Sequence, residues 1–432
     1  MKTKKTSICF IGAGYVGLTW AAVLANLGNW VFLIEANQEK LDQLKLGQAP
    51  IYEPGLSSLV KKTVKKGQLL PTSDWQKPIK KSQIIFVAVG TPVGDKGQAD
   101  LTQIKQVAKQ IGQNFSGDKK IIVNKSTVPV GTAWLVEKLI KKENPNAKFE
   151  VVSCPEFLRE GQAVTDTQKP SRVVIGTSSS WAFNQLKSLF LPLGAPIINT
   201  SRESAEIIKY AANSYLALRV GFIDQVALLC EKTGADVCQV IEGLGLDPRI
   251  GGHYWYPGIG YGGYCFPKDV AALAVTFKKT GLEKNLFSLL DRLNQERPAL
   301  YAQKLADCLG ENKTMAVLGL TAKPGTADMR GSQAVYFIEA LVKKGIGVRV
   351  FDPMGIPEAK KILTGVSFCS SVEEAVKKAD ALAILCEWPE FKKIDWLKIK
   401  KRMRGRFIFD AKRMFDKKKL SSLGLKYWGV GI

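Results

Sequence analysis

The chain has 432 residues, of which 46% are hydrophobic, and this length predicts two or three domains with ordinary globular cores. No apolar run approaches the ~18 residues of a membrane span, and the N-terminus leads into a strand without a signal-peptide core. We therefore expect a cytoplasmic protein with no membrane partner.

The formal charge of +23 suggests binding of polyanions, because basic surfaces are typical of phosphate-binding proteins. The 62 basic residues are spread along the chain and form no basic arm, so we expect no nucleic-acid partner. Nucleic-acid binding remains an alternative that depends on charge alone.

The eight cysteines show no C-x-x-C spacing, so neither a metal cluster nor a disulfide framework is expected. His253 is the only histidine of the sequence. Any histidine catalysis would depend on this residue, and one chain cannot build a multi-histidine metal site.

A dinucleotide-binding fingerprint opens the chain. Residues 7–11 form a predicted strand, Gly12-Ala13-Gly14-Tyr15-Val16-Gly17 a tight turn, and residues 18–27 a helix. A second predicted strand, residues 30–34, ends at Glu35, whose carboxylate can accept from both ribose hydroxyls. The acid favours NAD over NADP.

Polar loops follow three further predicted strands, at residues 84–89, 121–124 and 150–153. Ligands of open α/β sheets bind beyond the carboxyl ends of the strands, so these loops should border cofactor and substrate. Each could also be an ordinary surface turn. The loops are Gly90-Thr91-Pro92, residues 125–132 and residues 154–161.

The middle of the chain is helical. Lys209 and Asn213 share one face of a predicted helix over residues 204–232, either as a solvated stripe or as a functional pair. Farther on, Cys265 follows a glycine-rich turn and precedes the predicted helix 270–280. A helix N-terminus and Lys268 would favour its thiolate, so we interpret Cys265 as a nucleophile, with a packed free cysteine as the alternative.

Strands and helices alternate again near the C-terminus. The fold class is thus α/β, with two Rossmann-like parallel-sheet domains joined by a central long helix. We predict a dinucleotide-binding domain over residues 1–200, a helical connector with the Cys265 loop over 201–310 and a second α/β domain over 311–432, which lacks the glycine fingerprint and could hold a different nucleotide. The later strands are expected at residues 315–320, 347–351, 381–385 and 406–409, and the later helices at 286–309, 332–343 and 372–378.

Taken together, these motifs resemble the UDP-glucose 6-dehydrogenase family, one of the UDP-glucose/GDP-mannose dehydrogenases, over nearly the whole chain. The markers are, in order, Gly12–Gly17 of the fingerprint, Ile51-Tyr52-Glu53-Pro54-Gly55, Val89-Gly90-Thr91-Pro92, residues 126–132, residues 155–161, Lys209 with Asn213, residues 262–269 and Glu387-Trp388.

The resemblance implies a four-electron oxidation of a sugar C6 alcohol to a carboxylate, with NAD as cofactor and a nucleotide sugar as partner. Cys265 would carry a thiohemiacetal and then a thioester. Lys209 and Asn213 would stabilise the oxyanion, while Asp269, Glu156 and Thr127 match positions for proton transfer and water activation.

The same resemblance assigns binding residues and no metal. The cofactor residues are Gly12, Gly14, Tyr15, Val16, Gly17, Glu35, Lys40, Thr91, Thr127, Glu160, Lys268 and Arg330. The substrate residues are Glu156, Phe157, Leu158, Arg159, Lys209, Asn213, Arg249, Tyr254, Gly262, Lys323 and Lys412. Arg249 matches an arginine that reaches the neighbouring subunit, which implies a homodimer. The resemblance also implies that residues 1–200 bind NAD, that 201–310 carry the dimer contacts and that 311–432 bind the UDP-sugar.

Three segments depart from the family pattern. Ala322 and Ala327 stand where an aromatic and an acid are usual, Lys412-Arg413 where Arg-Asn is common, and Asp224-Gln225 where Asn-Glu is commoner. UDP-glucose is favoured by Gly260-Tyr261-Gly262-Gly263. GDP-mannose, a UDP-N-acetylhexosamine and a single-hydride oxidation of a β-hydroxy acid remain alternatives.

Overall fold

The computed structural model describes residues 6–432, which form two compact units. The first ends at Ala212 and the second begins at Asn213. Residues 1–5, which belong to the first predicted domain, lie outside the described residues.

The first unit is built on an eight-stranded sheet with the order β3-β2-β1-β4-β5-β6-β7-β8. Its first six strands are parallel in the order of dinucleotide-binding folds, and β7 joins β6 antiparallel. The strands are β1 (Ser7–Ile11), β2 (Trp30–Ile34), β3 (Leu69–Thr72), β4 (Ile84–Val87), β5 (Lys120–Asn124), β6 (Phe149–Ser153), β7 (Val173–Gly176) and β8 (Ile197–Thr200).

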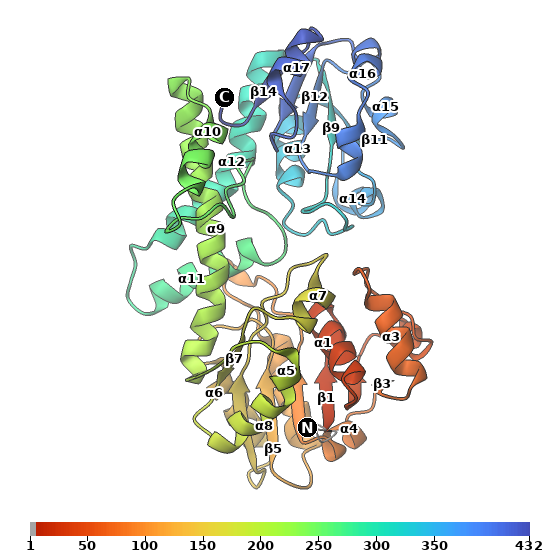
Figure 1. Ribbon diagram of the computed structural model, residues 1–432, viewed down its shortest axis with the longest axis vertical. Helices are drawn as coiled ribbons and strands as arrows, with labels where there is room; N and C mark the ends of the chain where they lie inside the picture. Colours follow the sequence, from red (N-terminus) through yellow and green to blue (C-terminus); the bar gives the residue numbers. More distant parts are fainter. Residues whose placement is uncertain (1–5) are drawn as a thin grey trace. The chain divides into compact units, whose positions relative to one another are not determined.

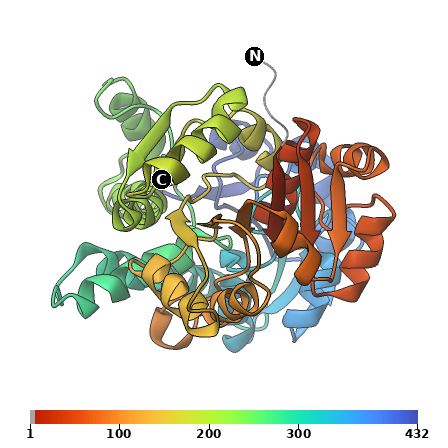
Figure 2. The same cartoon turned by 90° about the horizontal axis from the view of Figure 1, so that it is seen from below.

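Helices cover both faces of this sheet, whose strands are coloured red to yellow-green in Figures 1 and 2. Alternate strand residues, such as Phe10 and Ile11, enter different cores; α1, α3 and α8 close one core and α4, α5 and α6 the other. The helices are α1 (Tyr15–Asn26), α2 (Gln38–Lys45), α3 (Leu56–Lys65), α4 (Gln76–Lys81), α5 (Thr102–Gln113), α6 (Thr132–Glu143), α7 (Ala163–Gln168) and α8 (Ser180–Phe190), with short 3-10 turns η1 (Asp95–Gly97) and η2 (Leu191–Leu193).

The second unit contains a six-stranded parallel sheet with the order β11-β10-β9-β12-β13-β14. This order repeats the arrangement of the first six strands of the other unit. The strands are β9 (Thr314–Leu318), β10 (Gly347–Phe351), β11 (Val366–Phe368), β12 (Ala381–Ile384), β13 (Phe407–Asp410) and β14 (Lys426–Gly429).

The long helix α9 (Arg202–Thr233) begins in the first unit and continues into the second, where Ile223 and Ala227 join the core of the six-stranded sheet. It is the long yellow-green helix of Figure 1. The remaining helices are α10 (Val237–Gly245), α11 (Phe266–Lys279), α12 (Leu286–Leu309), α13 (Gln333–Lys343), α14 (Ile356–Ile362), α15 (Val372–Ala375), α16 (Trp396–Arg402) and α17 (Lys417–Ser422), with the 3-10 turn η3 (Pro389–Lys393).

The predicted fold class is confirmed: two Rossmann-like sheets and a long central helix. Element bounds differ locally, since α1 begins at Tyr15 and α11 at Phe266, earlier than their apolar faces indicated. Strands β3, β7, β8, β11 and β14 were not predicted; all five are only three or four residues long, and β3 contains Pro71. The three-part domain division stays a prediction.

The fingerprint turn is close-packed at its first and last glycines and open at the second. Gly12 has φ +98°, and a Cβ there would lie 2.6 Å from the Ala88 carbonyl oxygen. A Cβ at Gly17 would overlap the carbonyl oxygen of Gly12. At Gly14, in contrast, a Cβ would meet no atom within 4 Å.

We expect Gly17→Ala to lower the free energy of unfolding of the first unit by about 1–3 kcal/mol or more, because helix and turn must separate. Gly14→Ala is the matched control and should change it by less than about 1 kcal/mol. Denaturant unfolding without NAD measures both. Equal effects of the two substitutions would contradict the described packing of the turn.

Candidate active site

Glu35 lies beside the fingerprint turn, as the sequence predicts. One of its carboxylate oxygens accepts from the backbone N–H of Ala13 at 3.0 Å, and the other from Asn37 N–H at 2.8 Å. Gly14 is the N-cap of α1 and has no side chain with which to cap that helix. The N-terminus of a helix beside an open glycine fits a pyrophosphate, so this turn suits a dinucleotide.

Other predicted cofactor residues surround the same region of the first unit. The Tyr15 hydroxyl donates to the Tyr52 carbonyl at 3.4 Å, and Val16 is half-buried in α1 against the core. Lys40 lies in α2, where its backbone N–H donates to the Asn37 side chain at 2.9 Å. Glu160 is half-buried in the loop after β6.

Thr91 and Thr127 meet at the ends of the neighbouring strands β4 and β5. The Thr91 hydroxyl donates to the Thr127 carbonyl oxygen at 2.8 Å, and the Ser126 hydroxyl donates to the Val89 carbonyl oxygen at 2.7 Å. These two bonds tie the loops together, so the structure brings two sequence-predicted residues into contact.

A buried ion pair joins α9 to the loop after β6. The Lys209 ammonium lies 2.9 Å from a Glu156 carboxylate oxygen, and the side chains are only 3% and 7% exposed. Burial alone would raise the pKa of Glu156, but the charge of Lys209 and the Leu158 N–H bond, at 2.5 Å, outweigh it and lower that pKa. Lys209 is therefore no solvated stripe; it faces the predicted catalytic carboxylate.

Lys125 is a second buried lysine here, and sequence reasoning missed it. Its ammonium donates to the Pro155 carbonyl oxygen at 3.1 Å and lies 3.6 Å from the Cys154 sulfur and 4.2 Å from the centre of the Trp20 ring. Burial lowers the pKa of Lys125 and raises that of Cys154. The contacts fix the start of the loop that carries Glu156.

Glu53 holds the other end of that loop. Its carboxylate, 3% exposed, accepts from Gly161 N–H at 2.9 Å and Ala163 N–H at 2.7 Å. Although the family marker Ile51–Gly55 includes Glu53, its partners lie more than 100 residues later, so no local pattern could indicate this contact.

The predicted substrate residues of this loop have separate partners. The Phe157 ring stacks under the Arg172 guanidinium at 3.6 Å, and Leu158 packs against the core. Arg159 is exposed and forms an ion pair with Asp166 at 2.7 Å.

Cys265 is the N-cap of α11 in the second unit and is partly exposed, so the prediction that it precedes a helix N-terminus is confirmed. One turn later, the buried Asp269 accepts from the Asn213 amide at 2.6 Å and pairs with the Lys268 ammonium at 2.5 Å. Asp269 thus connects the cysteine helix to α9.

The turn before Cys265 is held by hydrogen bonds from side chains that the sequence did not predict to be site residues. Asn294 on α12 accepts from Tyr261 N–H at 2.8 Å and donates to the Tyr261 carbonyl at 3.0 Å. Gln333 donates to the same carbonyl at 2.7 Å. At Gly262, a Cβ would lie 2.6 Å from the Gly331 carbonyl oxygen, so only glycine allows this approach.

Arg330, Tyr254 and Arg249 lie around this turn and the segment before it. The Arg330 guanidinium lies 4.2 Å from the centre of the Tyr264 ring and pairs with Asp328. Tyr254 has φ +64° and stacks near Phe266. Arg249 pairs with Asp247 at 2.7 Å while 88% of its side chain is exposed.

The two lysines predicted to bind the nucleotide lie in the six-stranded domain. Lys323 is exposed, and Lys412 lies 3.5 Å from Glu387, whose pKa it lowers. Arg413, next to Lys412, is engaged by Asp236 at 3.0 Å and by the Val430 carbonyl. Arg413 is therefore committed to an internal ion pair, and Lys412 is the more available cation.

Family comparisons agree with this arrangement over most of the chain. Residues 6–194, 203–296 and 316–417 match the NAD binding, central and UDP binding domains described for the UDP-glucose/GDP-mannose dehydrogenase family. The chain belongs to that family.

Individual relatives cover almost the full length. The chain is 42% identical to UDP-glucose 6-dehydrogenase TuaD of Bacillus subtilis (strain 168), over 98% of this chain and 93% of that protein. It is 40% identical to a UDP-glucose 6-dehydrogenase of Rhizobium meliloti (strain 1021), over 98% and 99%. A solved UDP-glucose dehydrogenase of Pyrobaculum islandicum superposes with a TM-score of 0.92 at 34% identity, covering 96% of each chain.

Family membership assigns NAD as the cofactor and makes the chain a dehydrogenase of nucleotide sugars. The NAD binding domain contains the Glu35 turn, and the UDP binding domain contains Lys323 and Lys412. Within residues 6–432 no helix has the length and apolar character to cross a membrane, and no cluster of side chains could hold a metal ion.

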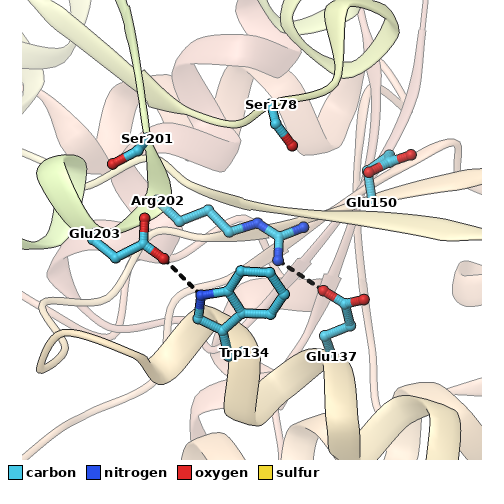
Figure 3. A pocket seen from close by; sticks show the side chains of 7 residues that line it. All are labelled: Trp134, Glu137, Glu150, Ser178, Ser201, Arg202 and Glu203. Atoms are coloured by element: carbon cyan, nitrogen blue, oxygen red, sulfur yellow. Dashed lines mark hydrogen bonds and ion pairs between the residues drawn. The ribbon is translucent and has the colours of Figure 1, made fainter.

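A pocket of about 320 Å³ lies elsewhere, between α6 and the start of α9 (Figure 3). Its charged groups already have partners: Arg202 pairs with Glu137 at 2.7 Å, Glu203 accepts from the Trp134 indole N–H at 2.6 Å, and Glu150 pairs with Lys119 at 2.8 Å. None of the predicted site residues lines it, so we interpret it as a packing gap between two helices.

Proposed function

We propose that this dehydrogenase oxidises the C6 alcohol of UDP-glucose to the carboxylate of UDP-glucuronate, with two molecules of NAD per sugar. The observation that carries the mechanism is Cys265 at the N-terminus of α11, one turn before the Asp269 that holds Asn213. A thiol nucleophile is what a second oxidation of an aldehyde requires.

The reaction at Cys265 runs through two covalent states. The C6 alcohol loses a proton and a hydride to become an aldehyde, and the Cys265 thiolate adds to it to give a thiohemiacetal. Loss of a second hydride gives a thioester, and water cleaves the C–S bond to release the carboxylate and the thiol. Bound NAD supplies the hydride acceptor for both oxidations.

Lys209 and Asn213 support the oxyanions of these steps. They lie one turn apart on α9, both nearly buried, so an ammonium and an amide donor face the same side of one helix. In a water-poor site such donors stabilise developing negative charge far better than in bulk water. Glu156, Asp269 and Thr127 would accept protons and orient the hydrolytic water.

The cofactor is proposed to bind the Gly12–Gly17 turn, with Tyr15 and Val16 at the start of α1, Glu35 on the ribose and Lys40 beside it. Thr91, Thr127, Glu160, Lys268 and Arg330 complete this set. Support comes from the open space at Gly14 and from the Glu35 bond to Ala13 that orients the carboxylate.

The UDP-sugar set comprises Glu156, Phe157, Leu158, Arg159, Lys209, Asn213, Arg249, Tyr254, Gly262, Lys323 and Lys412. Lys412 would meet the diphosphate as a point charge, without the fork of an arginine. The names of the two relatives above support UDP-glucose over GDP-mannose or a UDP-N-acetylhexosamine.

We place the enzyme in the cytoplasm. The cysteines of the described residues are free, and a nucleophilic thiol is preserved best in a reducing compartment.

We expect two NADH per UDP-glucose consumed, and little turnover of GDP-mannose or UDP-N-acetylglucosamine. Cys265→Ser should lower steady turnover by about three orders of magnitude or more, because the hydroxyl is a poor substitute for the thiolate. Absorbance of NADH and chromatography of the sugars measure both. One NADH per sugar, or a fully active Cys265→Ser, would contradict the proposal.

We further propose a homodimer, in which Arg249 reaches the substrate of the neighbouring subunit. An apolar stripe runs along α9 at heptad spacing: Tyr215, Phe222 and Leu229 are 58%, 49% and 62% exposed. Such a stripe fits its own copy across a two-fold axis. The Arg249 side chain is 88% exposed, so it can reach a neighbouring subunit.

The double variant Phe222→Lys/Leu229→Lys should be monomeric at concentrations at which the wild type is a dimer, because charges would enter an apolar interface. Sedimentation velocity distinguishes the two states. The matched control is Leu397→Lys on α16, also an exposed leucine, at 57%. A dimeric double variant would contradict a dimer formed through α9.

A further inference from the structure

Glu206 is a buried carboxylate, and the donors observed on its two oxygens are all uncharged. One oxygen accepts from Gly131 N–H at 2.8 Å, and the other from Ala133 N–H at 3.0 Å and from the Ser153 hydroxyl at 3.0 Å. The residue is 3% exposed. A carboxylate with three donors in the interior is a rigid link, because each bond is costly to lose there.

The three donors belong to elements that border the proposed active site. Gly131 and Ala133 open α6, whose N-cap makes no side-chain cap bond, so Glu206 supplies the missing cap from another helix. Ser153 is the last residue of β6, just before the loop that carries Glu156. Glu206 therefore joins the Thr127 loop, β6 and α9.

Lys209 follows Glu206 by one helical turn, on the same side of α9. The Lys209 ammonium lies 2.9 Å from Glu156, and Glu156 stands in the loop that begins directly after Ser153. The two partners of this ion pair thus stand on the two segments that the Glu206 carboxylate joins.

We propose that Glu206 is a positioning residue, whose carboxylate fixes the start of α9 against α6 and β6 so that Lys209 is held at Glu156. The inference depends on the proposed function only for its catalytic consequence. Glu206 itself touches neither substrate nor cofactor.

More exposed contacts between α6 and the start of α9 provide controls (Figure 3). The Glu203 carboxylate points toward the indole nitrogen of Trp134, and Arg202 lies over that ring and pairs with Glu137. Glu203 lies one turn before Glu206, but its partner Trp134 is 57% exposed. A substitution of Glu203 therefore removes a contact between α9 and α6 but leaves the buried Glu206 cap of α6 in place.

Glu206→Gln keeps the shape and replaces one acceptor oxygen by an NH2 group, which cannot accept from Gly131, Ala133 or Ser153. The start of α9 is then held less firmly and opens locally more often, which exposes Lys209 to solvent. We therefore expect the Lys209 ammonium to react about tenfold faster with an amine-labelling reagent. Isotope-coded reductive methylation with peptide mass spectrometry measures this reactivity without any turnover.

In the same variant, kcat should fall about 10- to 100-fold, since small misplacements of a catalytic group cost that much. The KM values for UDP-glucose and NAD should change less than about threefold, because the other residues of both proposed binding sets keep their contacts. Glu203→Gln should match the wild type in Lys209 labelling and kcat.

Lys120, 3% exposed at the opposite end of β5 from these loops, is the internal reference for general loosening. Unchanged Lys209 labelling in Glu206→Gln, or labelling of Lys120 that rises in parallel, would overturn the proposal. If Glu206→Gln does not fold, Ser153→Ala removes one donor and should shift Lys209 labelling in the same direction by less; no shift would overturn it. A wild type inactive on UDP-glucose would refute the proposed function, while the labelling still decides the role of Glu206.

Discussion

The buried pair of Lys209 and Glu156 is the interaction on which the loops of the proposed active site in the first unit depend. An ammonium taken out of water costs several kcal/mol unless a counter-charge and hydrogen bonds replace its hydration. The chain meets that requirement with Glu156, and then fixes Glu156 itself through the Leu158 N–H. The loop after β6 and the start of α9 are therefore specified together.

The same logic recurs along α9. One turn after Lys209, Asn213 donates to Asp269, whose other oxygen meets Lys268. The helix thus carries two consecutive buried polar positions, each satisfied by an acid from a different loop.

The two sheets show how one fold serves two ligands. Gly319 follows β9 as Gly12 follows β1: both have positive φ, and each N–H donates to the end of the neighbouring strand at 2.9 Å. Asp352 after β10 accepts from Leu320 N–H at 2.7 Å, as Glu35 accepts from Ala13. In the second sheet Asp352 also binds Trp388, so the acid is committed to holding loops and not to a ribose.

Local pattern predicted most of this architecture. Short apolar runs and the glycine turn predicted five of the eight strands of the first sheet, and the apolar face after Cys265 placed that thiol at a helix N-terminus. The roles of Glu53, Glu206 and Asn294 could not be read in this way, because their partners lie 33 to 110 residues away. A buried carboxylate that caps a distant helix leaves no periodic signal; it resembles any other acid on a helix or in a turn.

The measurement that tests the account most directly is rapid chemical quenching during turnover of UDP-glucose, followed by peptide mass spectrometry. It should be run on the wild type and on Glu156→Gln, in which hydrolysis of the thioester is expected to slow. The account predicts that the Cys265 peptide carries the mass of the oxidised nucleotide sugar, more in the variant than in the wild type. A Cys265 peptide that stays unmodified while NADH is produced, or an adduct on another residue, would contradict it.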